Sequence, residues 1–274
     1  KVEVKRGFMG VTVQYEDQKE VIPVIKDLST LEYDMSSAIK KLTADQKKMV
    51  AYTTGHGEVS SSEMSLALNQ IRERYIVDSV DLSTGNPIPE RVKTLLIINP
   101  ERPFSQEAKY QIDQYLMKGG RIALMNGKLK IDPTLSNPQG QFINVGLDDM
   151  LAHYGIKVNK DAVIDAQCIN IMVQRQQGQF NVSNQVQFPY IPQIRELNES
   201  HVVVNRLNNI ILQFPSSIDT SIASTRNIDV EVLATSSEKS GRKTGRVYVQ
   251  PFYNWTNADF PEKYIPVSAI YRGS

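Results

Sequence analysis

The segment Thr54-Gly55-His56-Gly57-Glu58, followed by Ser60, brings an imidazole, a carboxylate and two glycines together. An imidazole beside a carboxylate can transfer protons, and glycines let a backbone approach a ligand closely. A short apolar run precedes this segment and a helix start follows it, which places it where open parallel sheets bind ligands and where a helix N-terminus favours an anion. We therefore treat Thr54, Gly55, His56, Gly57, Glu58 and Ser60 as candidate ligand- or partner-binding residues. The alternative, which we weight more heavily, is a tight structural turn with His56 as a surface side chain.

Signatures of known cofactor sites and nucleophiles are missing from the sequence. The dinucleotide fingerprint needs a third glycine where Ser60 stands, and Gly241-Arg242-Lys243-Thr244-Gly245 lacks the spacing of a phosphate-binding loop. No G-x-S-x-G nucleophile elbow occurs. Cys168 is the only cysteine, so an intrachain disulfide and a cysteine-based zinc site are excluded, and we interpret it as a structural thiol. We predict no catalytic residue and no cofactor.

Three other groups of residues are open to a chemical and a structural interpretation. Asp149 and His153 have the spacing of two metal ligands on a helix, which is more typical of an ordinary polar helix face, so we predict no metal. Asp148 with Asp149 could be a catalytic carboxylate pair, but acidic residues at a helix start usually complement its dipole. Trp255 and its aromatic neighbours could stack on a sugar, although packing is the commoner role.

The composition is that of a globular protein with no strong electrostatic field. Of 274 residues, 41% are hydrophobic and 22% charged, and 31 basic residues against 30 acidic ones give a net charge of +1. That balance gives no indication of nucleic-acid binding. The sequence contains no apolar run long enough to span a membrane. It begins with the alternating Lys1-Val2-Glu3-Val4 and without methionine, so we expect flanking segments that carry targeting or membrane anchors.

Alternating strand and helix patterns indicate the elements that would position these residues. Residues 1–26 predict a hairpin and residues 31–42 a helix. Ser60 and Glu63 have the spacing of a capping box, and Ser105 can cap a later helix that Gly119-Gly120 would end. Four apolar runs predict strands separated by helices, and they cover residues 49–52, 77–82, 94–98 and 122–125. This alternation predicts a Rossmann-like α/β unit over residues 48–155, with a parallel sheet covered by helices on both faces.

The second half contains mostly short extended runs. They lie between residues 162 and 250, with a Gln- and Asn-rich excursion over 174–187 and a polar, basic loop over 236–245. We expect these strands to extend the same sheet or to form a small subdomain. The predicted organisation is therefore an N-terminal hairpin and helix in 1–45, the end of a preceding module, and an α/β domain in 46–274 with a strand-rich extension.

Several segments, in this order, resemble the auxiliary subunit of gliding-motility-type ABC transporters, the GldG-like family. The similarity lies in Thr53 to Glu58, Asp113 to Arg121 and Gly146 to Gly155, with Arg6 to Val11, Phe214 to Asp219 and Ile265 to Ile270 in agreement. It covers most of the chain. A related domain of intraflagellar-transport proteins is a binding module, and both resemble class I glutamine amidotransferase and flavodoxin-like folds. Where an amidotransferase carries its nucleophile elbow, this chain has Asn126-Gly127-Lys128 and no cysteine.

The resemblance implies an extracytoplasmic (periplasmic) domain of a membrane-anchored protein whose partners are an ABC permease and an ATPase. Together with the missing catalytic signatures, it favours a non-enzymatic module that binds a partner protein or a transported ligand near Gly55 to Ser62. Two alternatives stay open: a degenerate hydrolase that uses His56 and Glu58, and a carbohydrate-binding module that uses Trp255.

Overall fold

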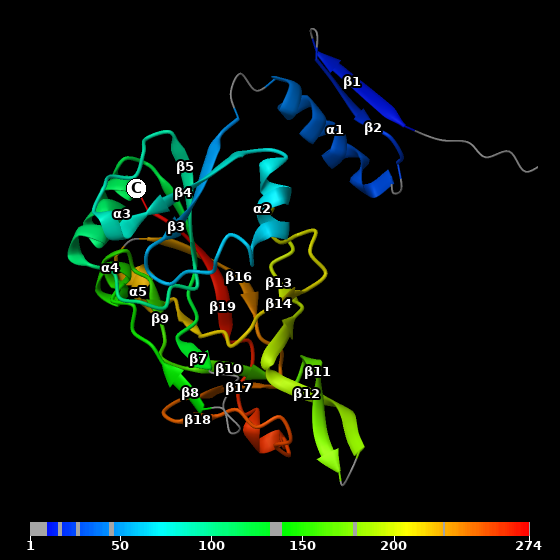
Figure 1. Ribbon diagram of the computed structural model, residues 1–274, viewed down its shortest axis with the longest axis vertical. Helices are drawn as coiled ribbons and strands as arrows, with labels where there is room; N and C mark the ends of the chain where they lie inside the picture. The colour runs from blue at the N-terminus through cyan, green and yellow to red at the C-terminus, as the bar shows by residue number, and fades with distance from the viewer. Residues whose placement is uncertain are drawn as a thin grey trace, which may run out of the picture.

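The computed structural model describes residues 10–15, 18–25, 28–43, 47–131, 139–177, 180–226 and 228–273 (Figure 1). Its first elements are the antiparallel hairpin β1 (Val11–Tyr15) and β2 (Gln18–Ile22) and the helix α1 (Leu28–Thr43), which packs on that hairpin. The predicted hairpin and helix are thus confirmed where the chain is described; residues 1–9 lie outside it. That this unit ends a preceding module stays a prediction.

A tyrosine and two arginines connect the N-terminal unit to the body of the molecule. The Tyr33 hydroxyl on α1 accepts a hydrogen bond from the guanidinium of Arg74, and the guanidinium carbons of Arg74 and Arg206 each lie 5.1 Å from the ring centroid. The hydrogen bond from Arg74 lowers the pKa of Tyr33. Both cation–π contacts are energetically favourable, so Tyr33 stabilises the packing of α1 against the body.

A four-stranded parallel sheet forms the first half of the body. Its strands are β3 (Met49–Thr54), β4 (Ile76–Asp81), β5 (Val92–Ile98) and β6 (Arg121–Met125), in the order β4-β3-β5-β6. The helices α2 (Ser65–Arg72) and α3 (Gln106–Met117) make two of the crossovers, and the short η1 (Leu82–Thr84) lies in the third. Buried residues of the sheet and α3, including Ala51, Leu95 and Ile112, form one hydrophobic core. The four predicted strands and the Ser105 cap are confirmed; the Ser105 Oγ accepts from the Ala108 amide at 3.1 Å.

The rest of the chain is built from small antiparallel sheets. The strands are β7 (Leu129–Ile131), β8 (Gln139–Phe142), β9 (Lys157–Val158), β10 (Ala162–Asp165), β11 (Cys168–Gln177), β12 (Phe180–Ile194), β13 (Glu196–Leu197), β14 (Ile210–Ile211), β15 (Ile218–Asp219), β16 (Asp229–Thr235), β17 (Ser240–Lys243), β18 (Val247–Tyr248) and β19 (Pro266–Arg272). The helices are α4 (Asp148–His153), α5 (Ser221–Thr225) and η2 (Asn257–Asp259). The sheets contain two or three strands each, in the orders β18-β8-β7, β15-β9, β10-β17, β11-β12-β14 and β13-β16-β19.

The predicted fold class, a Rossmann-like and mostly parallel α/β domain over residues 46–274, is therefore wrong. Parallel pairing is confined to β3–β6 in the described residues, and strands predominate over helices. The physical reason is the length of the connections. A parallel crossover needs a dozen or more residues, usually a helix, whereas only residues 166–167 separate β10 from β11, residues 178–179 separate β11 from β12, and residues 236–239 separate β16 from β17. These strands pair antiparallel instead of extending the parallel sheet, either with the next strand, as β11 does with β12, or with a distant one, as β10 does with β17.

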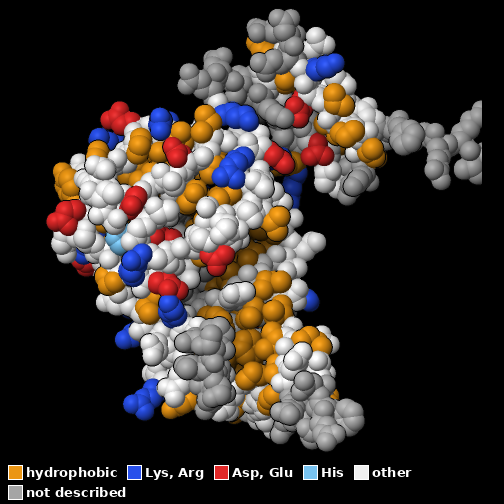
Figure 2. All heavy atoms as spheres, in the orientation of Figure 1, with side chains coloured by type: hydrophobic (Ala, Val, Ile, Leu, Met, Phe, Trp, Pro, Cys, Tyr) orange, Lys and Arg blue, Asp and Glu red, His pale blue; other side chains and the backbone are white. Residues whose placement is uncertain are grey.

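The prediction of a polar, basic loop over residues 236–245 is also wrong. Residues 240–243 form β17, which pairs with β10, and Ser236 and Ser240 are fully buried with their hydroxyls hydrogen-bonded at 2.7 Å. The polar composition of this segment reflects hydrogen bonding inside the molecule. The 174–187 excursion is the long β11–β12 hairpin, whose tip at 178–179 lies outside the described residues. Figure 2 shows hydrophobic side chains gathered in the hollow beside this hairpin. No helix in the described residues is long and apolar enough to cross a membrane.

Two buried carboxylates hold β10 in the second half of the body. Asp161, just before the strand, is 3% exposed and accepts from the amide of Ser217 at 2.8 Å and from its hydroxyl at 2.6 Å. Asp165 at the strand's end is fully buried and accepts from the amide and hydroxyl of Ser237 at 2.7 and 2.6 Å, and from the Gln167 amide at 2.7 Å. Each charge thus meets several donors, which burial of a charge requires.

We predict that Ser217→Ala lowers the free energy of unfolding by about 1–3 kcal/mol, because it leaves a buried carboxylate with one donor fewer. Chemical denaturation followed by circular dichroism measures the change. The matched substitution Ser61→Ala, at an exposed position, should stay within about 0.5 kcal/mol. Equal stability of the two variants would contradict this account of Asp161.

Candidate functional site

The glycine segment follows β3 at the carboxyl edge of the parallel sheet, as predicted. Gly55 and Gly57 have φ angles of +104° and +74°, which favour glycine over other residues. A Cβ on Gly55 would lie 2.4 Å from an Asp81 carboxylate oxygen, and one on Gly57 would lie 3.2 Å from the Cβ of Glu101. The close approach that these glycines permit is therefore to the protein's own residues, at the end of β4 and in the loop after β5. This geometry supports the structural interpretation of the two glycines.

His56 is buried, not a surface residue as the structural alternative assumed. It is 4% exposed, and its ring stacks on Phe104 with centroids 4.0 Å apart and planes inclined by 7°. Its carbonyl accepts hydrogen bonds from the amides of Glu101 and Arg102 at 2.9 and 2.8 Å. Burial lowers the pKa of His56, and the nearby Glu58 and Asp81 carboxylates oppose that shift only in part. A neutral imidazole packed in this way holds the loops after β3 and β5 together.

Glu58 interacts with the backbone of the same loop. Its Oε2 accepts from the His56 amide at 2.7 Å, so the carboxylate organises the turn and does not orient the imidazole as a catalytic pair would. Farther along, Ser60 is exposed, and the expected capping box is confirmed. The Ser60 amide donates to Glu63 Oε2 at 3.0 Å and the Glu63 amide to Ser60 Oγ at 3.4 Å. This box lies on a turn that leads into α2, which begins at Ser65.

Lysines that sequence reasoning did not single out tie other segments to this edge. Lys128 is almost fully buried, and its ammonium pairs with the half-exposed Asp148, while Lys130 pairs with Glu101. Lys128 stands two residues after Asn126, at the place where an amidotransferase would carry its nucleophile elbow. The short β7 therefore brings Lys130 against the loop that contacts His56. The signal in the sequence was a lysine directly after a buried strand and a glycine.

Five polar atoms in this part of the fold are buried without a hydrogen-bond partner among the described residues. They are the Thr53 hydroxyl, His56 Nδ1, Glu58 Oε1 and both side-chain amide atoms of Asn126. Buried polar groups normally have partners, and ordered water supplies them where protein does not. Thr53 and His56 belong to β3 and its loop, and Asn126 follows β6. The edge therefore has unused hydrogen-bonding capacity beneath its surface.

The other candidate residues have structural contacts. Asp148 and Asp149 begin α4 as expected, but they pair with Lys128 and Lys109. Trp255 is partly buried against Tyr190 and Phe260, at a second hydrophobic cluster formed by buried residues of the antiparallel half, and the Lys243 ammonium lies 5.5 Å from its ring centroid.

These contacts favour packing for Trp255 over a free sugar platform. Among the described residues, no three His, Cys, Asp or Glu side chains are placed to hold a metal ion. Cys168 is half-buried, and burial raises the pKa of its thiol, as expected of a structural cysteine.

We predict that acidification destabilises the protein partly through His56. Because burial holds its pKa below the unfolded value of about 6.5, the unfolded chain binds the proton more readily, and stability is lost as pH falls below that value. The variant His56→Phe keeps a ring against Phe104 and removes the proton site. Between pH 7.5 and pH 5, the wild type should lose more unfolding free energy than this variant does. Denaturant titration at each pH measures both values. His153→Phe, at an exposed position, is the control; a constant difference for His56→Phe would refute the assignment.

Comparisons with known proteins find a relative and a solved structure that are similar to this chain over part of its length. An uncharacterized protein of Borreliella burgdorferi (strain ATCC 35210 / DSM 4680 / CIP 102532 / B31) is 26% identical over 172 residues, which cover 61% of this chain and 33% of the relative. The match thus spans about a third of that relative's length. The solved mmIFT52 N-terminal domain has a TM-score of 0.46 at 15% identity, over 70% of this chain and 74% of that one.

The family model gives a broader match than either of these proteins. The model described as "ABC-type uncharacterized transport system" (ABC_transp_aux) matches residues 47–274, a range that begins two residues before β3 and ends at β19 and the residues after it. This range includes the glycine segment, both buried carboxylates and the serines that hold them. The chain therefore belongs to the ABC_transp_aux family of ABC-type transport-system auxiliary proteins.

Proposed function

We propose that this chain is the non-enzymatic, extracytoplasmic recognition domain of an ABC transporter auxiliary subunit of the gliding-motility type. The family match over residues 47–274 carries the proposal, because it associates the whole body of the molecule with an ABC transport system. The protein would be anchored by membrane segments outside this sequence and would assemble with a permease and an ATPase. The ordered series of motifs that resembles the GldG-like family supports this finer assignment.

The proposed contact surface is the rim of the carboxyl edge, formed by Thr54, Gly55, Gly57, Glu58 and Ser60 around the buried His56. Support comes from how firmly this rim is held. The His56 carbonyl binds two amides of the loop after β5, the His56 amide binds Glu58, and the capping box fixes Ser60. A preorganised loop loses little conformational freedom when a partner binds. His56 would act as a positioning residue beneath the surface, and Ser60 would be the exposed point of contact.

Crosslinking in cells tests the partner. A photo-crosslinking amino acid in place of exposed Ser60, in the full-length protein expressed with its transporter, should give a covalent adduct with the permease. The same substitution at exposed Asn184 on β12, in the distant hairpin, should give much less of that adduct. Adducts are identified by mass spectrometry of affinity-purified material. If the permease neither crosslinks nor co-purifies, the proposed assembly is wrong; equal adducts from both positions would contradict only the assigned surface.

A second measurement tests the side of the membrane. In the full-length protein, Cys168→Ala removes the single cysteine of this region, and Ser60→Cys adds an exposed one. A membrane-impermeant maleimide should label that thiol in cells whose outer membrane alone is permeabilised, because an extracytoplasmic domain faces the reagent. Ala166→Cys, half-buried beside β10, is a matched position with lower expected labelling. Labelling of Ser60→Cys only after the inner membrane is broken would overturn the extracytoplasmic assignment.

A further inference from the structure

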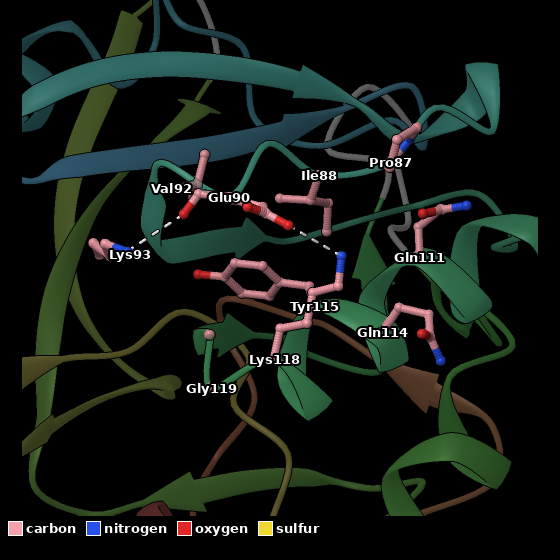
Figure 3. A pocket seen from close by; sticks show the side chains of 11 residues that line it. Pro87, Ile88, Glu90, Val92, Lys93, Gln111, Gln114, Tyr115, Lys118 and Gly119 are labelled. Atoms are coloured by element: carbon pink, nitrogen blue, oxygen red, sulfur yellow. Dashed lines mark hydrogen bonds and ion pairs between the residues drawn. The ribbon is translucent and has the colours of Figure 1, made fainter.

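A pocket lies at the amino edge of the parallel sheet, at the opposite ends of the strands from the glycine segment. It has a volume of about 390 Å³ and lies between the last turns of α3 and the segment 87–93 that leads into β5 (Figure 3). Val92 and Gly120, at the starts of β5 and β6, belong to its lining. A volume of this size falls within the range of small-ligand sites. The proposed transport-related surface does not include this pocket.

The base of the pocket is apolar and firmly positioned. Tyr115 and Ile88 line it and are only 6% and 8% exposed. The Tyr115 hydroxyl donates to the Arg121 carbonyl at 3.2 Å and accepts from the Arg121 amide at 3.3 Å, so the ring is fixed at its far end. A Cβ on Gly120 would come within 2.4 Å of that ring, so only glycine leaves the ring its place. The pocket therefore offers a preformed aromatic and aliphatic surface to an apolar group.

The rim of the pocket carries more positive than negative charge. Lys93 and Lys118 line it with a single carboxylate, Glu90. Lys118 Nζ lies 3.5 Å from Glu90 Oε1, and the two side chains are 63% and 85% exposed; Figure 3 draws this pair beside the Tyr115 ring. Lys93 Nζ donates to the backbone carbonyl of Glu90 at 3.4 Å. Exposed pairs of this kind contribute little to stability, so an incoming carboxylate can displace Glu90 from Lys118 at small cost.

Two amide side chains complete the wall on the helix side. Gln111 and Gln114 line the pocket from α3, three residues apart and therefore on one face of that helix, which Lys118 continues four residues after Gln114. A glutamine amide offers both donors and an acceptor, which matches the donor and acceptor of a peptide group. The wall thus presents peptide-like hydrogen-bonding groups next to an ammonium group, above an apolar base.

We propose that this pocket binds the carboxyl-terminal end of a peptide. Its carboxylate would pair with Lys118, its last peptide group would hydrogen-bond to Gln111, and an apolar side chain would lie on Tyr115. Each of these three features of the ligand meets the matching feature of the lining. The site is independent of the assembly proposed above, since it uses the other edge of the sheet.

Titration of the isotopically labelled chain with N-acetyl-leucine tests the proposal by nuclear magnetic resonance. The amide signals of Gly119 and Gly120 should shift saturably at ligand concentrations up to about 50 mM, which suffices for a millimolar dissociation constant. N-acetyl-leucinamide, which lacks the carboxylate, should bind at least about fivefold more weakly. Lys118→Met should weaken binding of the carboxylate by about fivefold and leave binding of the amide unchanged.

The control variant is Lys109→Met, on the same helix but paired with Asp149 outside the pocket, and it should bind both ligands as the wild type does. Thermal unfolding of each variant verifies that the fold is retained. Absence of saturable shifts at Gly119 and Gly120 with either ligand would overturn the site. Equal affinity for the carboxylate and the amide would overturn the assigned ligand class. Neither result bears on the transporter crosslink, so the two proposals fail separately.

Discussion

Asp161 and Asp165 introduce negative charge into the interior at the two ends of one four-residue strand. Burial of an ionised carboxylate is tolerated only where hydrogen bonds replace the lost water. Here the donors come from Ser217 and Ser237, in segments that are distant from β10 in the sequence. Those serines lie directly before β15 and shortly before β17. The hydrogen bonds that they donate to the two carboxylates therefore also position both strands. The neighbouring Ser216 belongs to the same hydrogen-bond network, because its hydroxyl accepts from the Lys128 amide and donates to the Asp161 carbonyl.

These hydrogen bonds connect the antiparallel half to the carboxyl edge of the parallel sheet. Ser216 accepts a hydrogen bond from the amide of Lys128, at the start of the segment in which Lys128 pairs with Asp148 and Lys130 pairs with Glu101. Glu101 in turn donates its amide to the carbonyl of His56. A chain of direct contacts thus runs from the buried carboxylates to the glycine segment. The space beside Gly55 and Gly57 at this edge is occupied by the protein's own Asp81 and Glu101.

Local signals in the sequence predicted the parallel half well and the second half poorly. Continuous apolar runs such as 94–98 and capping residues such as Ser105 act within a few positions, and the structure confirms them. Strand pairing depends on connection length and on distant partners: β10 pairs with β17 and β9 with β15, far apart in the sequence, and no local pattern indicates such partners. The glycine segment was correctly located after β3, yet the burial of His56 depends on Phe104, which belongs to another loop. Ser236 and Ser240 looked solvated because their buried partners are not visible in composition.

The positions of the two serines also set an order of events during biosynthesis. Asp161 and Asp165 leave the ribosome 56 and 72 residues before Ser217 and Ser237, which donate hydrogen bonds to them in the folded protein. At about 5–20 residues per second, the strand between them waits roughly 3–14 s for its donors. During that interval β3 to β6, which depend on earlier residues, can already pair, whereas β10 has to stay in water. The nascent chain therefore passes through a stage in which a finished parallel sheet carries an unfinished antiparallel half, with its apolar residues open to chaperones.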